Sequence, residues 1–62
     1  KIEKIDASFI KDLNKKQQDF IIRKAKGQEF KVPFHESEKI SMILSIQEDG
    51  YDIKEILKQY KK

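Results

Sequence analysis

This 62-residue sequence contains no cysteine and no tryptophan, and it has only one histidine, one proline and two glycines. Without cysteine, no disulfide can stabilise the fold and no thiolate can bind a metal. No apolar run reaches the roughly 18 residues of a membrane span, so we expect a soluble, cytoplasmic protein. No catalytic triad can be assembled around the single histidine, His35, and no glycine-rich phosphate loop is present. These absences predict a protein that is not an enzyme and that needs no cofactor or metal.

Charged residues outnumber hydrophobic ones, at 40% against 37% of the chain. A chain of this length forms one small domain and buries only about 60% of the surface that its unfolded state exposes. We therefore expect it to gain buried area as a homodimer, or in a complex with another protein or with DNA. Residues 1–27 carry a net charge of +4 and residues 28–62 a net charge of −1. Attraction to phosphate should therefore come mainly from a basic helical arm, residues 1–27.

The arm contains two signals for the start of a helix. Asp6 is placed to cap a helix that begins at Ala7. Asn14 lies three residues before Gln17, which is the spacing of a capping box. Residues 7–26 therefore form either one long helix or two short helices that meet at Asn14. Gly27 ends this region, and three cations before it suit the last turn of a helix and are candidate phosphate contacts: Arg23, Lys24 and Lys26.

Residues 28–34 alternate between polar and apolar side chains, which predicts a short strand. Pro33 cannot donate a hydrogen bond, so the segment is an edge strand or an unpaired extended segment. The chain offers no second strand, and pairing would require a second copy or a partner. Three of the four phenylalanines are expected to pack in the core: Phe20, Phe30 and Phe34.

Residues 36–48 predict a helix with apolar residues on several faces, which indicates burial on most sides. Gly50 should end this helix in a left-handed conformation, and Asp52 should cap a last helix. The expected fold is mainly α, with one or two N-terminal helices followed by strand, helix and helix. The expected centre of the core is Ile43, Leu44, Ile53, Ile56 and Leu57.

The order of strand, helix, glycine turn and capped helix in residues 29–60 resembles the ribbon-helix-helix family, which includes the Arc and methionine repressors. The resemblance is carried by Phe30-Lys-Val-Pro-Phe34, Gly50, Asp52-Ile53 and Ile56-Leu57. It implies a homodimer whose paired strands enter the major groove of DNA, and therefore a small DNA-binding transcriptional regulator. The base-reading positions that it implies are Glu29, Lys31 and Pro33.

Those positions differ in what they offer to DNA. Lys31 suits guanine or phosphate, and Glu29 suits cytosine, whereas Pro33 offers no hydrogen bond. In the family, the start of the second helix binds a phosphate, and here Asp52 places a carboxylate there.

The alternative function is a helical protein–protein interaction module, meaning an inhibitor, adaptor or assembly factor that binds no nucleic acid. Its candidate partner contacts are Met42 and Tyr51, the second of which we expect to be partly exposed beside the glycine turn. Residues 43–57 also resemble the two-helix glycine–aromatic loop of ubiquitin-associated domains. A helix-turn-helix built on residues 39–60 is a third option. Three serines share one helical face and are interpreted as surface or packing residues: Ser37, Ser41 and Ser45.

Overall fold

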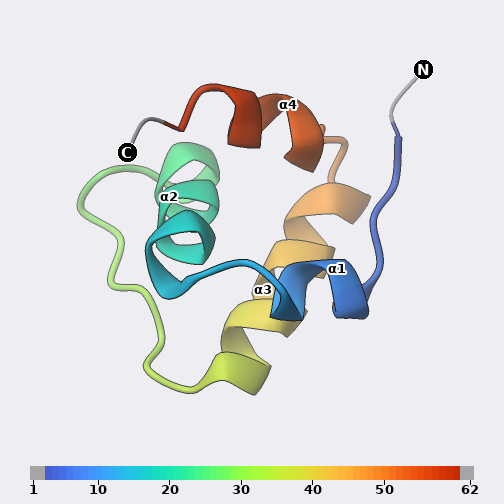
Figure 1. Ribbon diagram of the computed structural model, residues 1–62. Helices are drawn as coiled ribbons and strands as arrows, with labels where there is room; N and C mark the ends of the chain where they lie inside the picture. Colours follow the sequence, from blue (N-terminus) through green and yellow to red (C-terminus); the bar gives the residue numbers. More distant parts are fainter. Residues whose placement is uncertain (1–2, 61–62) are drawn as a thin grey trace.

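The computed structural model describes residues 3–60, which form four helices. These are α1 (Ala7–Lys11), α2 (Lys15–Lys26), α3 (Glu36–Glu48) and α4 (Ile53–Lys58). Helix α3 packs against α1 and α2, and α4 packs against α2. Figure 1 shows α4 across one end of the molecule and a long loop, residues 27–35, that runs from the end of α2 to the start of α3.

The predicted strand is wrong. Residues 28–34 form turns, a bend and irregular coil, and no strand occurs within residues 3–60. The fold is mainly α as expected, but it is not a strand-helix-helix unit. The alternating pattern failed because a strand needs a neighbour for its backbone hydrogen bonds, and the described residues provide none. Phe30 and Val32 instead pack singly against the helical core.

Two separate caps divide the N-terminal region into α1 and α2. Asp6 Oδ1 accepts a hydrogen bond from the Phe9 N–H at 3.0 Å. Asn14 Oδ1 accepts from the Gln17 N–H at 2.8 Å, and Gln17 Oε1 accepts from the Asn14 N–H at 3.0 Å. This reciprocal pair is a capping box. Of the two alternatives that the sequence left open, one long helix or two short ones, the structure shows two short helices.

Glycines end α2 and lie just beyond the end of α3, as predicted. Gly27 has φ +114° and ψ 153°, a region that is open essentially only to glycine. Gly50 has φ +110°. Its N–H donates to the Gln47 carbonyl at 3.0 Å, and the Tyr51 N–H donates to the Ile46 carbonyl at 3.4 Å. These two bonds form a Schellman motif, so the chain turns sharply between α3 and α4.

Asp52 caps α4 as predicted, because its Oδ1 accepts a hydrogen bond from the Glu55 N–H at 3.2 Å. The helix is shorter than the sequence pattern indicates, since it ends at Lys58. Tyr60 follows it and packs edge-to-face on Phe20 of α2, with 5.4 Å between the ring centroids. This aromatic contact holds the end of the described chain against α2.

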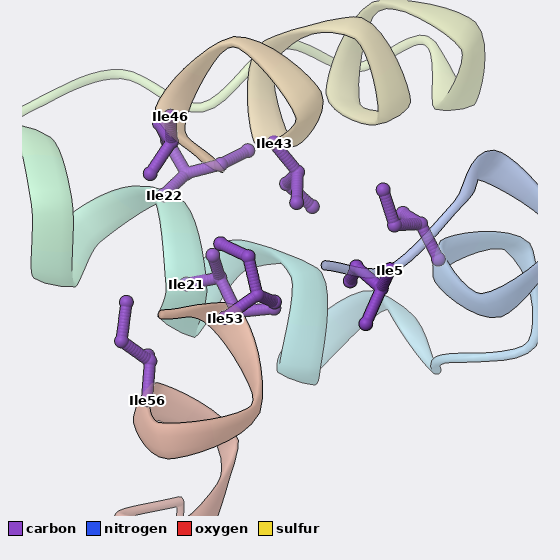
Figure 2. Packing of buried hydrophobic residues seen from close by; sticks show 8 residues of the cluster. Ile5, Ile21, Ile22, Ile43, Ile46, Ile53 and Ile56 are labelled. Atoms are coloured by element: carbon purple, nitrogen blue, oxygen red, sulfur yellow. The ribbon is translucent and has the colours of Figure 1, made fainter. Parts of the chain in front are cut away.

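Among residues 3–60, every buried hydrophobic residue is an isoleucine. Side chains from all four helices and from the segment before α1 point toward one another, as Figure 2 shows for most of them. They are Ile5, Ile10, Ile21, Ile22, Ile43, Ile46, Ile53 and Ile56. Of the five residues predicted at the centre, the three isoleucines are buried, whereas Leu44 and Leu57 are only partly buried.

Helix α3 is not buried on most sides, so that interpretation was wrong. Its buried face contains two polar residues, Lys39 and Gln47, beside two isoleucines. Three apolar residues of the same helix remain partly exposed: Ile40, Met42 and Leu44. Helix α3 therefore carries more apolar side chains than its neighbours cover.

Candidate interaction surface

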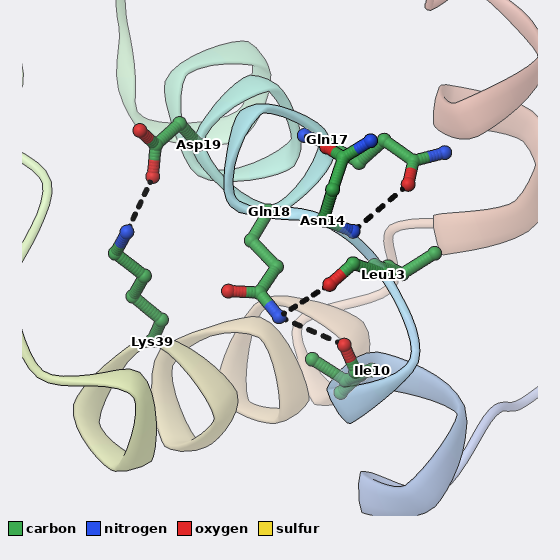
Figure 3. A network of polar contacts seen from close by, with 7 residues as sticks. All are labelled: Ile10, Leu13, Asn14, Gln17, Gln18, Asp19 and Lys39. Carbon is green, nitrogen blue, oxygen red and sulfur yellow. Dashed lines mark hydrogen bonds and ion pairs between the residues drawn. The ribbon is translucent and has the colours of Figure 1, made fainter.

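Two buried glutamines bond the backbone around α1: Gln47 bonds the segment before it, and Gln18 bonds its last turn and the residues after it. Gln47 Oε1 accepts from the Ile5 N–H at 2.8 Å, and its Nε2 donates to the Ile5 carbonyl at 3.0 Å. Gln18 Nε2 donates to the carbonyls of Ile10 at 2.8 Å and Leu13 at 3.3 Å (Figure 3). Sequence reasoning missed both glutamines. The available signal was their position, since each lies at helical spacing within an apolar stripe.

An ion pair joins α2 to α3. Lys39 Nζ lies 3.0 Å from Asp19 Oδ1, and the two side chains are 8% and 38% exposed (Figure 3). Asp19 Oδ1 is buried yet makes no well-aligned hydrogen bond, so the contact is chiefly ionic. The pair neutralises the one acidic residue of α2.

An open groove of about 760 Å³ lies between the loop 27–35 and α3. Its apolar lining comes from Phe30 and Pro33 of the loop and Met42 of α3. Small side chains on α3 leave the groove wide. The complete lining is Lys26, Phe30, Pro33, Ser37, Glu38, Ser41, Met42 and Ser45. The three serines of one helical face are exposed and border this groove.

Phe34 is 96% exposed, so its prediction as a core residue was wrong. Phe34 directly precedes His35, the N-cap residue of α3. The His35 side chain is exposed and makes no capping hydrogen bond. A hydrophobic residue at this position often packs against the fourth residue of the helix. Here that residue is Lys39, whose ammonium pairs with Asp19. Phe34 therefore lacks an apolar staple partner and borders a separate, smaller hollow of about 300 Å³.

The two predicted partner contacts lie in different places. Met42 is partly buried and lines the groove. Tyr51 is 42% exposed, which confirms the expected partial exposure, but it is not part of the groove lining. Its hydroxyl donates to the Ala25 carbonyl at 3.4 Å, so Tyr51 also ties the turn after α3 to α2.

The five predicted nucleic-acid contacts fall into two groups, and all five are exposed. Arg23, Lys24 and Lys26 lie at the end of α2, where the Arg23 guanidinium donates to the Gln28 carbonyl at 2.8 Å. Glu29 and Lys31 lie in the loop 27–35. Because that loop is not a strand, these two residues have no paired ribbon from which to read bases.

Within residues 3–60, no group of three or more acidic or histidine side chains is arranged to hold a metal ion. No helix in the same range combines the length and the apolar character needed to cross a membrane. No protein-family model matches this chain, and no curated protein or solved structure matches it significantly. The features of the molecule that bear on function are therefore the groove, Phe34 and the charges of α2.

Proposed function

We propose that the protein is a helical protein–protein interaction module that binds its partner through the groove and Phe34. Two observations carry this proposal: Phe34 is almost fully exposed, and the residue before it, Pro33, lines a groove with further apolar residues. Removing an aromatic side chain from water is favourable by about 25 cal/mol per Å² of apolar area. Aromatic side chains are enriched at protein interfaces, and apolar patches with polar rims mark such sites.

The composition of α3 supports the same surface. Met42 lines the groove, and Ile40 borders a neighbouring hollow that also includes Ser37. Small serine side chains allow a partner backbone to approach α3 closely. Helix-in-groove binding uses this combination of an apolar floor and open sides.

Site-specific photocrosslinking in cells of the source organism tests the proposal. A benzophenone amino acid replaces Phe34 in one variant, and it replaces Gln59 in a control. Gln59 follows α4, at the end of the molecule opposite the start of α3 (Figure 1). We expect a discrete protein adduct from position 34 and none from position 59.

A groove-blocking change makes the same test specific. Ser41 is exposed and lines the groove, so Ser41→Arg covers the groove without changing the core. In a variant that carries both Ser41→Arg and the crosslinker at position 34, most of the protein adduct should disappear. Absence of any adduct from position 34, or equal adducts from positions 34 and 59, would contradict the proposed function.

Nucleic-acid binding is a second candidate, and the charge of α2 favours it. Five cations of this helix are exposed: Lys15, Lys16, Arg23, Lys24 and Lys26. Its only acid, Asp19, is paired with Lys39. Such a cluster can attract phosphates without reading sequence. This candidate requires no ribbon.

Fluorescence anisotropy with duplex DNA tests the second candidate. We expect a Kd of about 10⁻⁴–10⁻⁶ M that weakens steeply with salt, because bound phosphates release counterions. Binding weakens linearly when the logarithm of the binding constant is plotted against the logarithm of the salt concentration. Replacing Lys16 and Lys24 with glutamine should make the slope of that plot less steep by about 0.9 for each phosphate contact that is lost. The matched control replaces two exposed lysines outside α2, Lys11 and Lys58. Equal losses in both double variants, or no binding at low salt, would rule out a role for α2.

A further inference from the structure

A pair of aromatic side chains lies among the cations of α2. Phe20 of α2 and Tyr60, which follows α4, meet edge to face with 5.4 Å between their ring centroids. Helices α2 and α4 pack against each other, and Figure 1 shows the chain after α4 returning toward α2. Phe20 and Tyr60 are both only partly buried. The core therefore does not enclose this aromatic pair.

Three exposed cations are the neighbours of Phe20 on the surface of α2. Lys16 lies four residues before Phe20, and Arg23 and Lys24 follow it by three and four residues. Residues at these spacings lie side by side on one face of a helix. Lys16 and Lys24 are therefore about 12 Å apart along the helix axis, with the aromatic pair between them.

The charge of this face is not neutralised within residues 3–60. Asp19, the only acid of α2, pairs with Lys39 of α3. None of the three cations around Phe20 belongs to an ion pair found in the described chain. The Arg23 guanidinium donates to the Gln28 carbonyl at 2.8 Å, which restrains its position and leaves its charge in place. The face therefore suits a ligand that carries negative charge on both sides of a flat ring.

We propose that this face binds single-stranded nucleic acid, with a base stacked on the Phe20–Tyr60 pair and phosphates bound by the cations on either side. It rests on the second candidate function, because it specifies which nucleic acid α2 takes. Aromatic side chains within a basic surface are the means by which proteins bind single strands without reading their sequence. Bases in a duplex are paired and stacked on one another, whereas a single strand can turn a base outward onto a protein ring.

The size of the face sets the length of the contact. A span of about 12 Å corresponds to about three to four nucleotides at about 3.4 Å per nucleotide. Binding should therefore be weak for one copy of the chain and should depend steeply on salt.

Fluorescence anisotropy at low salt with labelled strands of about 12 nucleotides tests the proposal. The probes are oligothymidylate and an abasic strand of equal length, which keeps the phosphates and lacks the bases. Oligothymidylate should bind about ten-fold more tightly, because stacking adds to the attraction between charges. Oligouridylate should bind like oligothymidylate, since neither contact uses the 2′-hydroxyl that distinguishes RNA from DNA.

Variants locate the stacked base. Phe20→Leu keeps an apolar side chain against the core and removes the ring, so it should lower the affinity for oligothymidylate to that for the abasic strand. Its affinities for the abasic strand and for duplex DNA should stay unchanged. The matched control is Phe9→Leu, the same change at a partly buried residue of α1 whose ring lies 5.5 Å from the Lys54 ammonium. This control should bind oligothymidylate as the parent chain does.

Circular dichroism checks that each variant is folded. If Phe20→Leu is unfolded, Tyr60→Leu decides with the same expected loss, since Tyr60 lies outside the helices. Equal affinities of the parent chain for oligothymidylate and the abasic strand would overturn the proposal and leave binding by charge alone standing. Equal losses in Phe20→Leu and Phe9→Leu would also overturn it. No binding to any strand or to duplex DNA would overturn the second candidate function as well.

Discussion

Replacing Ile43 with alanine should lower the free energy of unfolding by about 2–5 kcal/mol. Ile43 is fully buried near the middle of α3 and points into the isoleucine cluster (Figure 2). The change removes packed methyl groups and leaves a cavity that the short helices can only partly close. Domains below about 70–80 residues rarely gain more than about 3–5 kcal/mol from a single core. We therefore expect most of the variant to be unfolded in urea-denaturation experiments followed by circular dichroism.

The matched control is Ile40→Ala, the same chemical change on the same helix. Ile40 is only partly buried, so the expected loss is about 1 kcal/mol or less. Equal losses of stability in the two variants would mean that α3 does not bury the face shown by the structure.

Gln47→Leu should also destabilise the fold strongly, although leucine and glutamine have similar sizes. The change removes both hydrogen bonds to the backbone of Ile5. Each buried polar group left without a partner costs about 1–3 kcal/mol. The segment before α1 should then loosen, and Ile5 should leave the core with it.

Hydrogen exchange resolves this effect at one residue. In the parent chain the Ile5 amide should be protected, because it donates to a buried side chain. In Gln47→Leu that protection should disappear. Gln28→Leu is the control, since Gln28 is exposed and takes part only through its backbone carbonyl. Retained protection of Ile5 in Gln47→Leu would contradict the role assigned to Gln47.

Local patterns predicted the helix ends well because the atoms involved are close in the chain. The Asp6 and Asn14 caps each use a backbone N–H three residues further on. Residue types at these positions are therefore sufficient evidence. The surface was predicted less well: Met42 was named, but the groove and the exposed Phe34 were not.

Residues 28–34 show why a local pattern can mislead. Their alternation is typical of a strand, yet a strand exists only if another strand supplies hydrogen bonds. No such neighbour occurs within residues 3–60, and Phe30 packs against the helices instead. Without that strand, the paired ribbon that the family resemblance implied cannot form.

The sequence by itself determined the helical segments, the caps at Asp6, Asn14 and Asp52 and the two glycine ends, because these depend on contacts within about four residues. Whether residues 7–26 form one helix or two was left to the structure. Only the tertiary structure decided which polar residues are buried and which aromatic residue is exposed. Gln47 is buried because its side chain meets the backbone of Ile5, 42 residues away. Lys39 pairs with Asp19 across two helices, and Phe34 is exposed because that pairing leaves it no apolar neighbour on α3. Burial depends on partners distant in the chain, which no local pattern specifies.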